Sequence, residues 1–155
     1  MKNLQTWFDE YAVSHQNKTN QLIHYICVPA IFFSIVGMLM SIPSTTIETV
    51  LNINNPILEN WAAVILSILL LFYLRLSFST FLKMFVFSAI CLIGNRYLSD
   101  VFPLFYTSLI IFVVAWIGQF YGHKIEGKKP SFFKDLQFLL IGPAWVFEKL
   151  TNSNH

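Results

Sequence analysis

Two long windows without Asp, Glu, Lys or Arg constrain this chain more than any other feature. They cover residues 19–47 and residues 101–123, and most positions in both are apolar. A helix needs about 20 predominantly apolar residues to cross the hydrocarbon core of a bilayer. The two windows therefore predict transmembrane helices over residues 22–42 and 103–122.

A third apolar stretch, residues 57–98, is too long for a single span and carries Arg75 and Lys83 near its middle. The Ser-Phe-Ser-Thr run between these two cations is typical of a tight turn. We expect both cations to snorkel to the same interface, because long basic side chains keep their charge in water while their stems stay in lipid. The turn predicts two spans here, over residues 58–77 and 81–98.

Composition supports an all-α, multi-pass membrane protein with a single membrane domain over residues 1–155. Charged residues make up 12% of the chain and hydrophobic residues 55%, whereas soluble domains carry roughly 25% charged residues. The two cysteines, Cys27 and Cys91, lie in apolar runs and predict no disulfide framework. We expect no nucleic-acid partner, since no basic stripe interleaves with aromatics, and no signal peptide, since no apolar region follows the basic start.

The basic residues predict the orientation of the four spans. Nine of the ten Lys and Arg residues fall on one side of this topology, and Arg96 is alone on the other. Because cytoplasmic loops carry the excess of Lys and Arg, both termini are predicted to be cytoplasmic. A bacterial inner membrane is favoured over the endoplasmic reticulum, because the chain is compact and has no retention signal.

The C-terminal tail, residues 134–150, differs from the spans. Its charge-free run covers residues 136–147, which is too short to cross a bilayer comfortably. Gly142 and Pro143 interrupt the run. An interfacial or re-entrant helical segment on the cytoplasmic side is therefore expected.

Three of the four histidines are predicted to lie at one membrane boundary. His15 precedes the first span, His24 lies in its first turns, and His123 closes the last span. A continuous helix would place His15 and His24 on opposite faces. We therefore expect a break at residues 16–20, with Thr19 or Asn20 capping the helix that follows.

Several neighbours share a helix face with these histidines. Asn20 is four residues before His24, and Glu126 is three residues after His123. Asn20 is expected to orient an imidazole from outside the ligand set. Cys27, three residues after His24, is a soft ligand or a buried inert thiol.

Imidazoles with a carboxylate and open positions are typical of non-haem Fe(II) oxygenases, although imidazole also suits zinc, copper and nickel. Lys124 and Lys128 are expected to favour an anionic head group at the same boundary, besides setting the topology. Glu126 is either a further ligand or the partner of a nearby lysine. A fatty acid with its tail in lipid is a suitable substrate for a site at this level.

Two motifs resemble the small membrane family that contains the fungal 2-hydroxy-fatty-acid dioxygenase of phytosphingosine breakdown. The first is Tyr11-x3-His15-x4-Asn20-x3-His24, followed by Pro29. The second is Gln119-Phe120-Tyr121-Gly122-His123-x2-Glu126-Gly127-x2-Pro130, followed by Gly142-Pro143 and Glu148. The middle spans match this family in hydropathy. The fungal enzyme has a further histidine in that region, where this chain has none, so Asn95 and Asp100 are candidates for a substitute.

The resemblance implies an Fe(II)-dependent dioxygenase that performs α-oxidation. A 2-hydroxy fatty acid and O2 would give a fatty acid one carbon shorter, without 2-oxoglutarate. By match to the motifs, His15, His24 and His123 would bind the iron, with Asn20 and Glu126 as supporting residues or additional ligands.

Two other classes of function stay open at this point. A b-type haem protein would use two of the same histidines as axial ligands. A non-enzymatic lipid-binding protein would use them structurally. A histidine-box di-iron enzyme is disfavoured by the histidine count, and a serine hydrolase by the lack of a GxSxG elbow. Chain-length preference and oligomeric state are not predicted.

Overall fold

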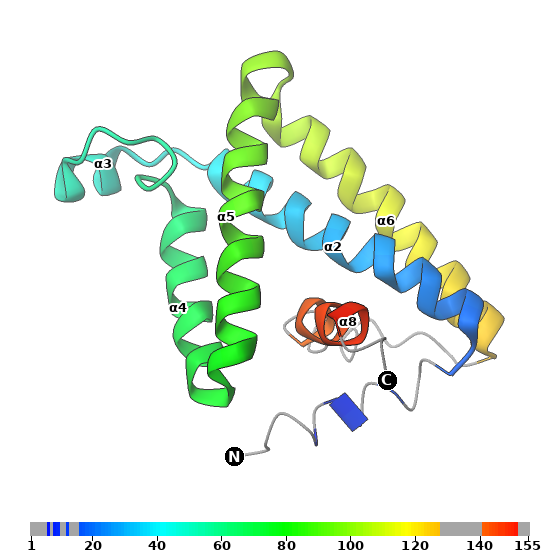
Figure 1. Ribbon diagram of the computed structural model, residues 1–155. Coiled ribbons are helices and arrows are strands. Elements are labelled where there is room, and N and C mark those ends of the chain that lie inside the picture. The colour runs from blue at the N-terminus through cyan, green and yellow to red at the C-terminus, as the bar shows by residue number, and fades with distance from the viewer. Residues whose placement is uncertain (1–5, 7, 10–11, 13–15, 128–140, 152–155) are drawn as a thin grey trace. The chain divides into compact units, whose positions relative to one another are not determined.

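The computed structural model describes residues 6, 8–9, 12, 16–127 and 141–151, and every regular element in these ranges is a helix (Figure 1). This confirms the predicted all-α fold class. The helices are α2 (Lys18–Met40), α3 (Thr45–Leu51), α4 (Trp61–Leu76), α5 (Phe78–Val101), α6 (Leu104–Glu126) and α8 (Gly142–Thr151).

Three helices, α2, α5 and α6, are long and apolar enough to cross a membrane. They have 23, 24 and 23 residues and correspond to three of the four predicted spans. The fourth predicted span corresponds to α4, which is also apolar but has only 16 residues. Three spanning helices are therefore supported by length, and a fourth crossing stays a prediction.

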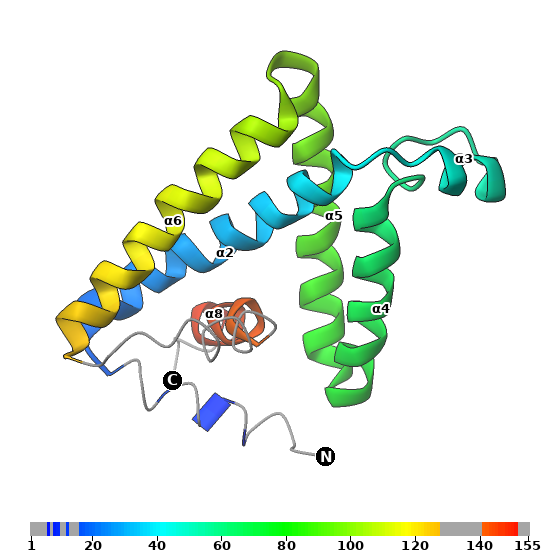
Figure 2. The ribbon, with the colours of Figure 1, turned by 180° about the vertical axis from the view of Figure 1, so that it is seen from behind.

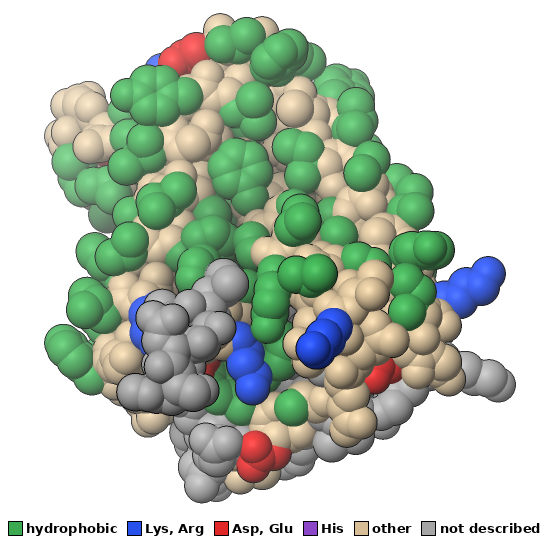
Figure 3. Space-filling view, turned by 45° about the vertical axis from the view of Figure 1, so that its right-hand side comes forward, with side chains coloured by type: hydrophobic (Ala, Val, Ile, Leu, Met, Phe, Trp, Pro, Cys, Tyr) green, Lys and Arg blue, Asp and Glu red, His purple; other side chains and the backbone are tan. Residues whose placement is uncertain are grey.

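Large apolar side chains on these helices are exposed, as expected for surfaces that face lipid. Ile26, Ile90 and Ile110 expose 73%, 59% and 64% of their surface. Hydrophobic side chains are spread over the upper part of the face in Figure 3, and most charged side chains seen there lie in its lower part. A water-soluble protein rarely exposes apolar patches of this extent.

Helix α2 begins where the sequence predicts a break, but the capping residue differs from the prediction. The side chain of Asn17 accepts hydrogen bonds from the backbone N–H groups of Thr19 (2.9 Å) and Asn20 (3.4 Å). Asn17 is thus the N-cap, because a cap residue satisfies the otherwise unpaired donors of the first turn. The prediction of Thr19 or Asn20 as the cap was wrong, since both already lie within the helix.

The turn between α4 and α5 is shorter than predicted. Leu76 ends one helix and Phe78 begins the next, so Ser77 alone separates them. Ser77 adopts an extended backbone conformation (φ −168°, ψ 134°). One extended residue is enough to reverse the chain, and α4 and α5 run side by side (Figures 1 and 2).

The chain divides into two compact units, which we call the end unit (residues 1–32 and 113–155) and the middle unit (residues 33–112). The middle unit contains the α4–α5 pair and a buried amide at Asn95. The Nδ2 group of Asn95 donates to the backbone oxygens of Phe33 (3.0 Å) and Cys91 (2.9 Å). Such side-chain amides tie helices together where no water is present.

The connection at residues 42–59, rich in Ser, Thr, Asn and Pro, contains the short helix α3. It is closed by the buried carboxylate of Glu59. This group accepts hydrogen bonds from the backbone N–H groups of Ile53, Asn54 and Asn55, at 2.6, 3.1 and 2.9 Å. The loop is therefore an ordered structure rather than a simple linker.

In the end unit, Gly142 and Pro143 begin helix α8. Proline is tolerated there because the first turn of a helix has no intrahelical partners for its N–H groups. Residues 141–146 are all buried. The rest of the predicted tail, residues 134–140, lies outside the described residues.

Candidate metal centre

His24 and His123 come from opposite ends of the chain and meet in the end unit. Their ring centroids are 5.1 Å apart, and the ring planes are almost perpendicular, at 87°. His24 lies in the second turn of α2, and His123 lies in the last turn of α6. Both side chains are buried, with 2% and 4% of their surface exposed.

The orientation of the His24 ring follows from its own helix. Its Nδ1 atom lies 3.0 Å from the backbone oxygen of Asn20. A carbonyl oxygen can only accept, so Nδ1 carries the proton in this bond and a neutral ring keeps its lone pair on Nε2. A metal ion bound by this tautomer would therefore be bound through Nε2.

The carboxylate of Glu126 connects the two helices. Its Oε1 atom accepts from the backbone N–H of Gln16 at 3.0 Å, and its Oε2 atom accepts from the backbone N–H of Asn17 at 2.9 Å. Oε2 also accepts from the side-chain amide of Asn20 at 3.0 Å. One side chain on α6 therefore holds both the backbone before α2 and the first turn of α2.

Two glycines on α6 allow α2 and α6 to approach each other closely. A Cβ atom at Gly118 would lie 2.6 Å from the sulfur of Cys27, and one at Gly122 would overlap the side-chain oxygen of Asn20. Figures 1 and 2 show α2 and α6 side by side. Glycines four residues apart are a common device for close helix packing in membranes, and here they make room for Asn20 and Cys27.

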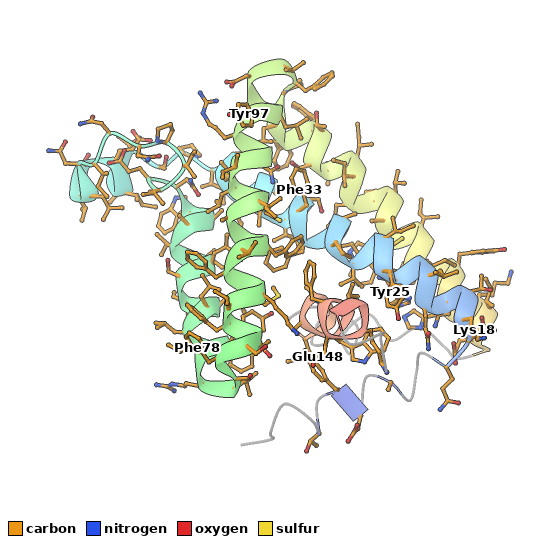
Figure 4. All side chains as sticks on the ribbon, viewed as in Figure 1. Lys18, Tyr25, Phe33, Phe78, Tyr97 and Glu148 are labelled. Atoms are coloured by element: carbon orange, nitrogen blue, oxygen red, sulfur yellow. The ribbon has the colours of Figure 1, made fainter. Side chains whose placement is uncertain are left out.

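Helix α8 contributes an aromatic contact next to this pair. Trp145, which is 2% exposed, packs on Tyr25 of α2 with ring centroids 6.0 Å apart. Tyr25 directly follows His24 and is labelled in Figure 4. The amine of Lys149 lies 5.9 Å from the centroid of the Trp145 ring, which is within the range of a cation–π interaction.

The structure places the remaining predicted site residues as follows. His15 and Lys128 lie outside the described residues. Lys124 is exposed on α6. Asp100 pairs with Arg96 at the end of α5. Within residues 16–127 and 141–151, no group of three or more His, Cys, Asp or Glu side chains is arranged to hold a metal ion.

Two imidazoles on one ion have a characteristic separation. With metal–nitrogen bonds of about 2.0–2.1 Å, rings at adjacent coordination positions have centroids roughly 4.6–5.3 Å apart. The observed 5.1 Å falls within this range. In donor type and separation the pair is compatible with a shared transition metal ion, and the described residues add no third His, Cys, Asp or Glu ligand to it.

Sequence reasoning missed the contacts of Glu126 with the backbone before α2 and the packing of α8. The sequence does contain one sign of the Glu126 contacts. A carboxylate as the last residue of a helix faces the negative end of the helix dipole, which is unfavourable unless another partner stabilises it. Glu126 occupies such a position in α6.

Residues 1–154 of the chain match the family described as 2-hydroxy-palmitic acid dioxygenase Mpo1-like. No curated protein and no solved structure matches the chain.

Proposed function

Because the chain belongs to the 2-hydroxy-palmitic acid dioxygenase Mpo1-like family, we propose that it is an Fe(II)-dependent membrane dioxygenase. Its substrates are 2-hydroxy fatty acids, and its products are fatty acids one carbon shorter. The observation that carries the proposal is the buried pair of His24 and His123, 5.1 Å apart. The proposed ligands are these two residues and His15.

The reaction balances with O2 as its single co-substrate. A 2-hydroxy acid and O2 contain the atoms of the shortened acid, CO2 and one water, so no external reductant and no 2-oxoglutarate are needed. When bound, iron would supply activation of O2 next to the 2-hydroxy and carboxylate oxygens of the substrate. The bond that breaks joins the carboxyl carbon to the carbon that bears the hydroxyl group.

The residues of the chain would orient and shield the reactants. The backbone oxygen of Asn20 holds the His24 ring with Nε2 unprotonated. Burial of both rings excludes water from the site, which strengthens its electrostatic interactions. Lys124, exposed close to His123, is proposed to attract the anionic head group of the substrate.

The ring separation bears on the haem alternative. His24 and His123 are in direct edge-to-face contact, with ring centroids 5.1 Å apart. This contact leaves no room for a haem between the two rings.

The proposed location follows from the charge distribution. Lys18 and Lys124, near the two histidines in sequence, belong to the basic side of the chain. By the positive-inside rule this side is cytoplasmic. We place the site at the cytoplasmic leaflet, with both termini cytoplasmic, in a bacterial inner membrane.

The activity can be tested with purified protein in detergent, loaded with Fe(II) under anaerobic conditions and given 2-hydroxypalmitate. Addition of O2 should release pentadecanoate, detected by mass spectrometry, and omission of either O2 or iron should abolish the product. Retention of lipid without turnover would favour the non-enzymatic alternative. A Soret band in the visible spectrum would favour haem.

A further inference from the structure

We propose that Glu126 is a positioning residue rather than an iron ligand, and that its carboxylate holds three segments in register: residues 16–17, the first turn of α2 and the last turn of α6. This inference rests on the proposed function for its chemical consequence. Its geometric part concerns only contacts between described residues.

The first segment is the backbone directly before α2. Both oxygens of Glu126 accept from backbone N–H groups at Gln16 and Asn17, 110 and 109 residues away in sequence. In the sequence, Gln16 directly follows His15, the third proposed ligand. The described backbone that Glu126 holds is therefore the part of the chain that follows this histidine.

The second segment is the first turn of α2. The side-chain amide of Asn20 donates to Oε2 of Glu126, and the backbone oxygen of the same residue accepts from His24 Nδ1. Asn20 is fully buried and lies in the space left by Gly122. Through this residue, the position of the Glu126 carboxylate is linked to the orientation of the His24 ring.

The third segment is the last turn of α6. Glu126 follows His123 by three residues, so the carboxylate and the imidazole project from the same helix face. Gly127, with φ of 72°, ends the helix directly after it. This left-handed conformation suits glycine and fixes where the carboxylate emerges.

Electrostatics explains why a carboxylate occupies this position. The C-terminal end of α6 repels a negative charge, whereas the N-terminal end of α2 attracts one. Three charge-assisted hydrogen bonds also stabilise the ionised group. With both oxygens occupied by protein donors, the carboxylate is already satisfied without a metal ion.

The test compares Glu126→Gln with the matched control Glu48→Gln, which alters an exposed carboxylate in the middle unit. Co(II) replaces iron as the probe, because its visible absorption spectrum reports the ligand set. A glutamine cannot serve all three donors, since it has a single acceptor oxygen and adds an N–H group. We expect Glu126→Gln to bind Co(II) with an unchanged spectrum and about 10–100-fold lower affinity. Glu48→Gln should behave as wild type.

Two outcomes with Co(II) would overturn the proposal: an altered spectrum in Glu126→Gln, which would make Glu126 a ligand, or an unchanged affinity. A second measurement does not depend on metal. Amide hydrogen exchange at Gln16 and Asn17 should become faster in Glu126→Gln, and unchanged protection would contradict the positioning role. Glu126→Asp, which keeps the charge on a shorter side chain, is the milder variant and should loosen the same amides.

Co(II) binding and amide exchange distinguish a failure of the metal site from a failure of the positioning role. If wild type binds no Co(II) but the amides at Gln16 and Asn17 lose protection in Glu126→Gln, the positioning contact stands and the metal site fails. If wild type binds Co(II) and both affinity and protection are unaffected by Glu126→Gln, the metal site stands and the positioning role fails.

Discussion

His24 and His123 should respond alike to truncation, because each supplies one ring to the same buried pair. We expect His24→Ala and His123→Ala each to lower Fe(II) affinity by at least about 100-fold, more than the loss of a supporting residue. Equilibrium dialysis with iron analysis measures this. His155→Ala is the matched control, since His155 is assigned no role.

If His24→Ala or His123→Ala binds iron as tightly as wild type, the replaced histidine is not a ligand. The same assay on His15→Ala tests the third proposed ligand. A loss equal to that of the other two variants is expected.

The single residues show what the sequence could and could not predict about the site. His24 lies near the start of the first apolar window and His123 lies at the end of the last one. These positions were sufficient to predict that both rings lie at the same membrane boundary. The partners of Glu126 were not predictable, because they are two backbone N–H groups and one side-chain amide, all more than 100 residues away. Contacts of that kind depend on how two helices pack, not on local spacing.

At the scale of helices, the close approach of α2 and α6 depends on the two glycines of α6. Gly118→Ala would place a methyl group against the sulfur of Cys27. We expect a loss of about 1–3 kcal/mol in the free energy of unfolding, as for other overpacked interiors. Thermal unfolding in detergent measures the change.

A double-mutant cycle gives this prediction its control. In a Cys27→Ala background the sulfur is gone, so Gly118→Ala should lower the free energy of unfolding much less than it does in wild type. Equal costs in both backgrounds would mean that Gly118 and Cys27 are not in contact.

The helices themselves were largely predictable, and their ends were not. Charge-free windows located α2 and α6, since a membrane span must be apolar along its length. At the end near the histidines both helices extend beyond the predicted bounds, because polar residues such as Lys18 and Glu126 continue the helix past the apolar part; at the other end they stop one or two residues inside them. The turn at Ser77 was predicted but not its one-residue length, and α3 was not predicted, since one extended residue and a seven-residue helix leave little periodic signal.

At the scale of the whole molecule, the distribution of Lys and Arg predicts that both termini lie on the cytoplasmic side. A fluorescent protein fused to the C-terminus should therefore fluoresce when the chain is expressed in bacteria, and an alkaline phosphatase fused there should be inactive. The reverse pattern would place the site at the outer leaflet.

The central claim is that buried imidazoles from both ends of the chain hold one iron ion. X-ray absorption at the iron edge of the Fe(II)-loaded protein tests it most directly. The account predicts one iron per chain, with scattering from at least two imidazole rings that weakens in His24→Ala and in His123→Ala. Iron without imidazole scattering, or no retained iron, would contradict it.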